Sequence, residues 1–305
     1  MPYCSAVGRR LDLKIGFACN NRCRFCVQGD KRTRFAPRPL AELRDLLARA
    51  RPDADGVVFT GGEPTLRPDL PELVAHARAL GYRSIQVQTN GRRLAYPAYL
   101  DTLVAAGVTE FSPALHGHTA ALHDSLTGAP GAFAQTVAGL RALAARGLHV
   151  IANSVITRPN HTHLEELARL LCSLGVAQYQ LAFVHPTGTA GAEFDAIVPR
   201  MSEVAPFLRA GLAVGARAGV PAYSEAVPEC VLGAYADRAA ERIIPDTTVI
   251  DAELTIADYT RYRRESGKLK GPRCPTCARF AACEGPWREY PERLGWDEFV
   301  PVSAA

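Results

Sequence analysis

Two groups of cysteines have the residue type and spacing that bind metal centres. In the first group, Cys19, Cys23 and Cys26 follow the pattern C-x3-C-x2-C. Thiolates are soft ligands that select zinc or iron–sulfur centres. A structural zinc ion needs four protein ligands, and no fourth one lies nearby in the sequence. We therefore expect an iron–sulfur cluster with one metal position open to an external ligand. The alternative is a zinc knuckle completed by a distant residue.

The second group lies toward the C-terminus. Cys274, Cys277 and Cys283 follow C-x2-C-x5-C, and Cys230 upstream completes a set of four. Four thiolates saturate either a zinc ion or a [4Fe-4S] cluster and leave no open position. The spacing alone leaves both alternatives open. It also leaves open whether Cys4 replaces Cys230 as the fourth ligand.

A glycine-rich motif follows the second predicted strand and reads Gly61-Gly62-Glu63-Pro64. Glycine lets the backbone approach a ligand closely, and an acidic or carbonyl acceptor suits an ammonium group. By itself the motif would indicate only a turn. Its position at a strand end, shortly after the cysteine triad, indicates a binding site.

Together these motifs resemble those of the radical S-adenosylmethionine (SAM) superfamily, over about residues 11–220. The triad follows a first strand and has an aromatic residue, Phe25, before its last cysteine, and the glycine-rich motif matches the family's GGEP. The resemblance implies that the three cysteines bind three irons of a [4Fe-4S] cluster and that SAM chelates the fourth iron. It implies that Gly61, Gly62, Glu63 and Pro64 contact the SAM amino group.

Three polar residues at later strand ends extend the resemblance. Asn90, Ser112 and Asn153 stand where the family often places polar contacts to SAM. Their alternative role is that of ordinary turn or strand-end residues. His116, which follows the fourth predicted strand, is a candidate acid/base group.

The tail resembles the auxiliary-cluster extensions called SPASM and twitch domains. The full SPASM pattern has a further cysteine where this chain has Trp287. The resemblance implies one auxiliary [4Fe-4S] cluster on Cys230, Cys274, Cys277 and Cys283, with a structural zinc site as the alternative.

The resemblance also implies an activity. A low-potential donor of the flavodoxin or ferredoxin type supplies an electron, SAM is cleaved to a 5′-deoxyadenosyl radical, and the radical abstracts a hydrogen from an unactivated C–H bond. A ribosomal peptide is the first candidate substrate. Because the first strand begins by residue 11, we expect a peptide to need direct docking or a separate recognition protein. The alternatives are a small molecule of cofactor or natural-product biosynthesis, and a non-catalytic scaffold or electron carrier.

The elements that must position these residues alternate between strands and helices. Such alternation predicts a parallel sheet with ligands at the carboxyl ends of its strands. We expect an α/β fold, a partial (β/α)6 TIM-like barrel over residues 1–220, with a small cluster-binding extension over residues 221–305 that includes a short hairpin. The predicted strands are Leu11–Phe17, Gly56–Thr60, Ser84–Thr89, Glu110–Leu115, His149–Thr157 and Gln178–Val184, and the predicted helices are Leu40–Ala50, Asp69–Leu80, Tyr96–Ala106, Phe133–Ala145, His163–Leu174 and Ser202–Ala218.

Composition narrows the function classes. The chain has 305 residues, 48% of them hydrophobic, and a net charge of +4. No basic stripe with interleaved aromatics indicates nucleic-acid binding. No signal peptide or membrane-length apolar run is present, so we expect a cytoplasmic protein without a membrane partner. A cytoplasmic location keeps thiols reduced, which favours metal binding over disulfides for the nine cysteines.

Overall fold

The strands of the protein form a curved parallel wall. The computed structural model describes residues 8–303. One sheet has the order β4-β3-β2-β1-β8-β9 and a second has the order β5-β6-β7. Parallel bridges from Phe111 to Val150 and from Ala114 to Asn153 connect β4 to β5. The strands are β1 (Arg9–Lys14), β2 (Gly56–Thr60), β3 (Ser84–Thr89), β4 (Glu110–Pro113), β5 (Ile151–Ile156), β6 (Gln178–Phe183), β7 (Ala222–Glu225), β8 (Asp246–Ile250) and β9 (Thr255–Ile256).

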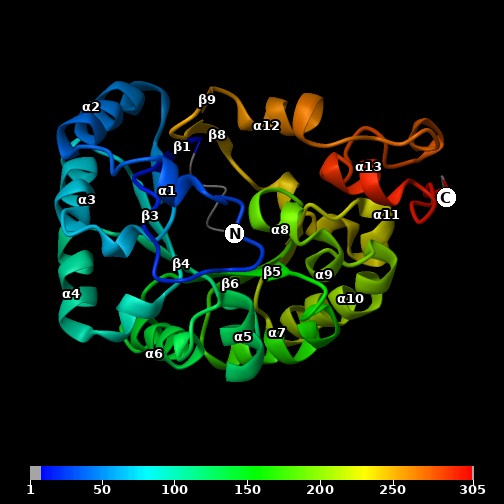
Figure 1. Cartoon of the computed structure of the whole chain (residues 1–305), viewed down its shortest axis with the longest axis horizontal. Helices are drawn as coiled ribbons and strands as arrows, with labels where there is room; N and C mark the ends of the chain where they lie inside the picture. Colours follow the sequence, from blue (N-terminus) through cyan, green and yellow to red (C-terminus); the bar gives the residue numbers. More distant parts are fainter. Residues whose placement is uncertain (1–7, 304–305) are drawn as a thin grey trace.

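The longer helices lie outside this wall and form an arc around it (Figure 1). They are α2 (Leu40–Ala50), α3 (Leu70–Ala79), α4 (Pro97–Ala106), α5 (Ala120–Thr127), α6 (Ala132–Ala144), α7 (Leu164–Ser173) and α10 (Met201–Ala218). The shorter helices are α1 (Lys31–Arg34), α8 (Gly188–Ala192), α9 (Phe194–Ile197), α11 (Glu229–Leu232), α12 (Tyr259–Tyr262) and α13 (Glu289–Leu294). Within the described residues, no helix combines the length and the hydropathy that crossing a membrane requires.

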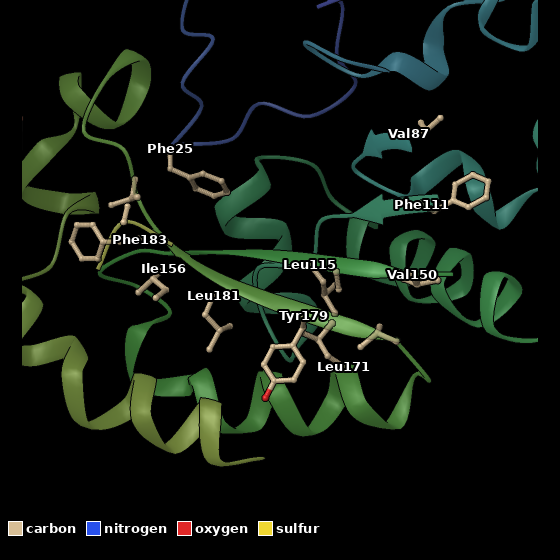
Figure 2. Packing of buried hydrophobic residues seen from close by; sticks show 14 of the residues in the cluster. Phe25, Val87, Phe111, Leu115, Val150, Ile156, Leu171, Tyr179, Leu181 and Phe183 are labelled. Atoms are coloured by element: carbon tan, nitrogen blue, oxygen red, sulfur yellow. The ribbon is translucent and has the colours of Figure 1, made fainter. Parts of the chain in front are cut away.

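The main hydrophobic core lies between the strands and the outer helices. In α7, Leu164, Leu167, Ala168 and Leu171 recur at three- and four-residue spacing and are all buried. This spacing places them on one helix face, which packs toward the sheet. Figure 2 shows Leu171 near Tyr179 of β6, with aromatic and aliphatic side chains continuing along the strands. The apolar face of each strand therefore points outward, and its other face points into the barrel.

The predicted fold class, a partial TIM-like barrel, is confirmed, and the tail adds to the wall. The expected hairpin is present, because β8 pairs antiparallel with β9. In addition, β8 pairs parallel with β1, from Arg9↔Asp246 to Leu13↔Ile250, which the sequence did not indicate. After residue 220, β7 extends the β5–β6 sheet. The division into domains at that residue stays a prediction.

Candidate active site and the two cysteine groups

The cysteine triad lies in the loop that follows β1. All three thiols are partly buried. Burial raises the pKa of Cys19, and it raises the pKa of Cys23 to about 12, with further contributions from the charges of Cys26 and Cys19. The three thiols are thus close enough to repel one another as thiolates. A cationic iron–sulfur cluster among them would offset both the burial of the thiolates and their mutual repulsion. The donor set therefore fits such a cluster.

The barrel holds this loop from several sides. The Arg22 N–H donates to the Thr127 carbonyl at 2.7 Å, and the Arg24 N–H donates to the Leu126 carbonyl at 3.0 Å. From α8, which follows β6, the Thr189 N–H donates to the Cys26 carbonyl at 3.0 Å. The loop therefore has a fixed path that the surrounding elements impose.

The two glycines of the GGEP motif let the chain pack closely against the segment that follows β1. Gly61 has φ +130°, and a Cβ there would lie 2.2 Å from the Gly16 carbonyl oxygen. A Cβ on Gly62 would lie 2.4 Å from the Phe17 oxygen. The Gly62 N–H donates to the Gly16 carbonyl at 2.8 Å. Glycine is needed here because the motif approaches the backbone just before Cys19.

Glu63 ties the ends of β2 and β3 together. Its buried carboxylate accepts hydrogen bonds from the Thr65 N–H at 3.0 Å, the Thr65 hydroxyl at 2.5 Å, the Thr89 hydroxyl at 2.6 Å and the Asn90 N–H at 2.6 Å. Burial raises the pKa of Glu63, against the effect of these hydrogen bonds. The Asn90 side chain donates to Asn20 of the triad loop at 2.6 Å. Glu63 and Asn90 thus lie beside the triad, whereas their contact with SAM stays a prediction, as does that of Pro64.

Inside the strand wall lies a polar chamber of about 410 Å³. Val27 and Gln28, which directly follow Cys26, form part of its lining, so the chamber adjoins the triad loop. The β8–β9 hairpin and α12 line another side. The inward-facing strand residues include Arg10, Asp12, Lys14, Gln86, Gln88, Ser112, Asn153, Gln178, Gln180 and Glu225.

Most charges in the chamber are already paired. Lys14 lies 3.0 Å from Asp12, and Lys31 lies 2.7 Å from Asp251. Arg10 is different, because its side chain makes no hydrogen bond or ion pair within residues 8–303 and its buried Nε has no partner there, although its charge opposes the rise that burial causes in the pKa of Glu110 and Glu225. An unpaired guanidinium in a polar chamber suits a ligand with a negatively charged group.

Two predicted SAM contacts line this chamber. Ser112 and Asn153 come from the neighbouring strands β4 and β5. The Asn153 Oδ1 atom is buried and has no hydrogen-bond partner in the described part of the chain. A buried acceptor without a protein partner is costly unless a ligand or water supplies a donor.

His116, the predicted acid/base group, lies among buried residues beside the triad loop. His116 is buried, and its ring lies edge-on to Phe25 with 4.7 Å between ring centroids. Its Nδ1 atom accepts a hydrogen bond from the Val155 N–H at 3.1 Å. Burial lowers the pKa of His116 to about 3, with a smaller contribution from His123. The His116 ring thus packs against the triad loop, and its acid/base role stays a prediction.

The sequence reasoning missed Arg10, Gln180 and Glu225. The Gln180 side chain donates to the Glu225 carboxyl group, and burial raises the pKa of Glu225, with the negative charge of Glu241 as the second cause. A signal for the polar interior was present in the sequence, since polar residues recur at every second position of β1, β3 and β6.

The four cysteines of the second group line one surface pocket. Cys230 comes from α11, whereas Cys274, Cys277 and Cys283 come from the tail. Burial raises the pKa of Cys230 to about 12, and the charges of the other three thiols add to that rise. The structure thus places Cys230 with the other three, while Cys4 lies outside the described residues.

In residues 8–303, no three histidine, cysteine or carboxylate side chains converge closely enough to hold one ion. Backbone N–H groups instead point at individual tail sulfurs. Gly271 donates to the Cys274 Sγ at 3.2 Å, and Val302 donates to the Cys277 Sγ at 3.3 Å. Hydrogen bonds to thiolate sulfur are a feature of iron–sulfur sites, where they tune the reduction potential.

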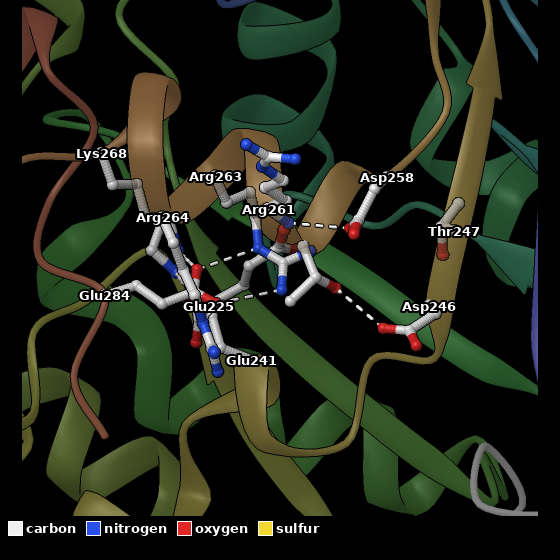
Figure 3. A network of polar contacts seen from close by, with 12 residues as sticks. Glu225, Glu241, Asp246, Thr247, Asp258, Arg261, Arg263, Arg264, Lys268 and Glu284 are labelled. Atoms are coloured by element: carbon white, nitrogen blue, oxygen red, sulfur yellow. Dashed lines mark hydrogen bonds and ion pairs between the residues drawn. The ribbon is translucent and has the colours of Figure 1, made fainter. Parts of the chain in front are cut away.

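A buried ionic network joins the tail to the barrel (Figure 3). Arg263 donates to both oxygens of Glu284, at 2.9 and 3.1 Å, and Lys268 donates to Glu284 at 3.1 Å. Lys268 also donates to Glu241, whose carboxylate accepts from the Ala226 N–H at 2.7 Å. Glu284 directly follows Cys283, and Ala226 directly follows β7. The network therefore fixes the tail against the strand wall.

The comparisons with known proteins agree with this geometry. The sequence model of the Radical SAM superfamily matches residues 13–176. An AdoMet-dependent heme synthase of Oleidesulfovibrio alaskensis is 31% identical over 185 residues, which are 60% of this chain and 47% of that protein. A probable GTP 3′,8-cyclase of Saccharolobus islandicus is 33% identical over 196 residues, 61% of each protein. The chain thus spans about half to three fifths of the length of these relatives.

Solved structures share the fold at low sequence identity. SuiB of Streptococcus suis bound to S-adenosylmethionine superposes with a TM-score of 0.67 and 14% identity, over 97% of this chain and 76% of that chain. The anSMEcpe enzyme with bound AdoMet and the Kp18Cys peptide gives a TM-score of 0.58 and 16% identity, over 70% of this chain and 63% of that chain. These likenesses support the fold. Since the superfamily model matches more than half of the sequence, this chain belongs to the radical SAM superfamily, whose members use a [4Fe-4S] cluster and SAM.

Proposed function

We propose that the chain cleaves SAM reductively at a [4Fe-4S] cluster on Cys19, Cys23 and Cys26 and acts on a substrate held in the polar chamber. The observation that carries this proposal is that Val27 and Gln28, the residues after Cys26, line the chamber. When bound, the cluster and SAM supply a 5′-deoxyadenosyl radical that abstracts a hydrogen atom from the substrate.

The residues of the chain itself would position the substrate. Inward-facing amides, among them Gln86, Gln88, Gln178 and Gln180, offer donors and acceptors on opposite walls of the chamber. Arg10 offers a cation, and Asn153 offers an unpaired acceptor. Fixed polar groups of this kind orient a substrate so that one C–H bond faces the radical source.

These walls favour a small polar substrate that carries an anionic group. The chamber has a volume typical of small-molecule sites. A ribosomal peptide is the second candidate, and the observation that favours it is the likeness to SuiB bound to its precursor peptide SuiA, with a TM-score of 0.66 over 91% of this chain. A peptide would place one polar residue in the chamber.

For the tail we propose an auxiliary [4Fe-4S] cluster on Cys230, Cys274, Cys277 and Cys283. The observation that supports it is that the four thiols line one pocket. A cubane cluster spreads its ligands over four irons, so it suits thiols that are near one another but not tightly clustered.

The test is the metal content and SAM cleavage of the anaerobically reconstituted protein. Wild type should hold about eight irons, and Cys19→Ala/Cys23→Ala/Cys26→Ala about four. With dithionite as reductant, wild type should form 5′-deoxyadenosine and the triple variant none. Zinc without iron in both proteins would overturn the proposal. About four irons and one zinc in wild type would overturn only the auxiliary cluster.

Formation of 5′-deoxyadenosine can also distinguish the two substrate classes. A cell extract that stimulates 5′-deoxyadenosine formation should keep this ability after exhaustive protease treatment if the substrate is a small molecule. Loss of stimulation after the treatment would favour the peptide.

A further inference from the structure

The pocket of the tail cysteines opens on a positively charged face. Between Lys268 and Cys283 the sequence contains no aspartate or glutamate. The exposed cations of this segment are Lys270, Arg273 and Arg279, and all three line the pocket. We call these three residues, with Phe280 and Val300, the tail face.

Two cations of the tail face, Lys270 and Arg273, are held by backbone oxygens, so their charges are largely uncompensated. Lys270 donates to the Phe280 carbonyl at 2.5 Å, and Arg273 donates to the Asp297 carbonyl at 3.1 Å. Arg279 reaches the buried Glu229 carboxylate only at 4.0 Å. Within residues 8–303, neither Lys270 nor Arg273 has a carboxylate within ion-pair distance. A carbonyl fixes the position of a cation but leaves its net charge available to an anionic partner.

Apolar side chains accompany these charges. Phe280 is 42% exposed and Val300 is 64% exposed, and both line the same pocket as the four cysteines. Exposed apolar side chains beside charged ones are typical of a surface that binds another protein.

A second feature connects the tail with the chamber. Trp287 lies four residues after Cys283 and is buried. The His185 ring stacks on it with 4.0 Å between ring centroids and 11° between planes. His185 also lines the chamber. A stacked pair of side chains thus connects the chamber wall with the segment that follows Cys283.

We propose that the tail face is the docking surface for an acidic electron-carrier protein, with a flavin or iron–sulfur cofactor, that exchanges electrons with the tail centre. This inference rests on the auxiliary cluster proposed above. The step is a one-electron transfer: the reduced carrier loses one electron, the tail cluster gains it, and no bond changes. Positive charge at the tail face speeds encounter with an acidic carrier and positions its cofactor over the cysteines.

The experiment isolates the tail centre. In Cys19→Ala/Cys23→Ala/Cys26→Ala, only the tail cluster remains, and its reduction by photoreduced flavodoxin is followed by stopped-flow absorbance at low ionic strength. Adding Lys270→Glu/Arg273→Glu should slow this reduction at least tenfold. Reduction by dithionite, which needs no docking surface, should change less than twofold.

Two control variants separate charge from local damage. Lys270→Gln/Arg273→Gln should give an intermediate rate. Arg49→Glu/Arg169→Glu changes the net charge equally at two exposed sites on α2 and α7, and it should leave the rate close to that of the parent. For the parent, added salt should reduce the rate with flavodoxin but not the rate with dithionite.

The outcomes are decisive for the docking proposal. Equal flavodoxin rates in the parent and in Lys270→Glu/Arg273→Glu would overturn it, as would equal slowing by Arg49→Glu/Arg169→Glu. A tail centre that neither flavodoxin nor dithionite reduces would also overturn it. None of these results would affect SAM cleavage by the wild-type triad with dithionite, so the proposed function is tested separately.

Discussion

The two cysteine groups show two ways of building a metal site. The triad loop is held from outside, because α5 accepts backbone hydrogen bonds from Arg22 and Arg24, and α8 donates one to Cys26. The GGEP glycines seat it against β1. The surrounding barrel would hold this path even without a cluster.

The tail group is held mainly by its own chain. The Ala278 N–H donates to the Val302 carbonyl at 2.9 Å, and the Leu269 N–H donates to the Pro286 carbonyl at 3.0 Å. Beyond the buried ionic network, the tail between residues 272 and 282 is mostly exposed. The difference teaches that the proposed triad cluster would bind in a scaffold formed without it, whereas the proposed tail cluster would form part of the fold.

The largest expected effect of this difference appears when metal is removed. A metal ligand that completes a small fold contributes on the order of 10 kcal/mol to its folding. In metal-free protein, trypsin should therefore cut quickly after Arg273 and Arg279 and slowly after Arg22 and Arg24. Mass spectrometry of timed digests measures both. Equal cleavage of the two loops would show that the triad loop also depends on its cluster.

Replacing a buried glutamate by glutamine should destabilise the protein in the tail and stabilise it in the barrel wall. Glu284 lies between two buried cations, Arg263 and Lys268. Glu284→Gln leaves those cations without their shared anion and should lower the free energy of unfolding by about 3–5 kcal/mol. Thermal melting at pH 7.5 and tail proteolysis measure the loss. An unchanged melting temperature would mean that the network does not hold the tail.

In the barrel wall, Glu110→Gln should instead raise the free energy of unfolding near neutral pH. Burial raises the pKa of Glu110 from 4.5 to about 7, and the charge of Arg10 opposes this only in part. Because the folded protein binds this proton more tightly than the unfolded chain, wild-type stability falls as pH rises from about 4.5 to about 7. Glu110→Gln should remove up to about 3 kcal/mol of that loss.

Melting temperatures of wild type and Glu110→Gln between pH 4.5 and 8 provide the test. The melting temperature of the variant should rise relative to that of wild type as the pH increases to about 7. Above that pH, the difference should stay constant. A constant difference across the whole range would show that Glu110 is ionised throughout.

The smallest expected effects come from two glycines, one beside each centre. Gly62→Ala would bring a Cβ to 2.4 Å from the Phe17 oxygen, and Gly285→Ala, at φ +83°, would bring one to 1.9 Å from the Leu269 oxygen. Each substitution should cost about 1–3 kcal/mol. Gly62→Ala should lower triad iron and 5′-deoxyadenosine formation, whereas Gly285→Ala should lower tail iron only. If either substitution also lowered the iron content of the other centre, the two centres would be mechanically coupled.

Much of the fold could be predicted from the sequence because it depends on local patterns. Strand and helix periods, such as Gly56–Thr60 and Leu164–Leu171, are properties of neighbouring residues, and their alternation implies a parallel barrel. The placement of β8 beside β1 could not be predicted in this way, since it joins residues more than 230 positions apart.

The candidate site was predictable to a smaller extent. The triad and the GGEP motif are contiguous sequences, so their chemistry could be read directly. His116 could not be judged, because its burial beneath Phe25 and its lowered pKa arise from tertiary packing. Glu225 lies in a strand that the sequence pattern did not indicate.

By itself, the sequence determined the cysteine groups, the glycines that bring the chain near the triad, and the radical SAM resemblance. Only the tertiary structure decided that alternate strand residues enclose a polar chamber, that Cys230 joins the tail cysteines, and that three tail cations surround them. The physical reason is that residue spacing fixes local geometry, whereas burial, charge pairing and the contents of a cavity depend on which distant elements pack together.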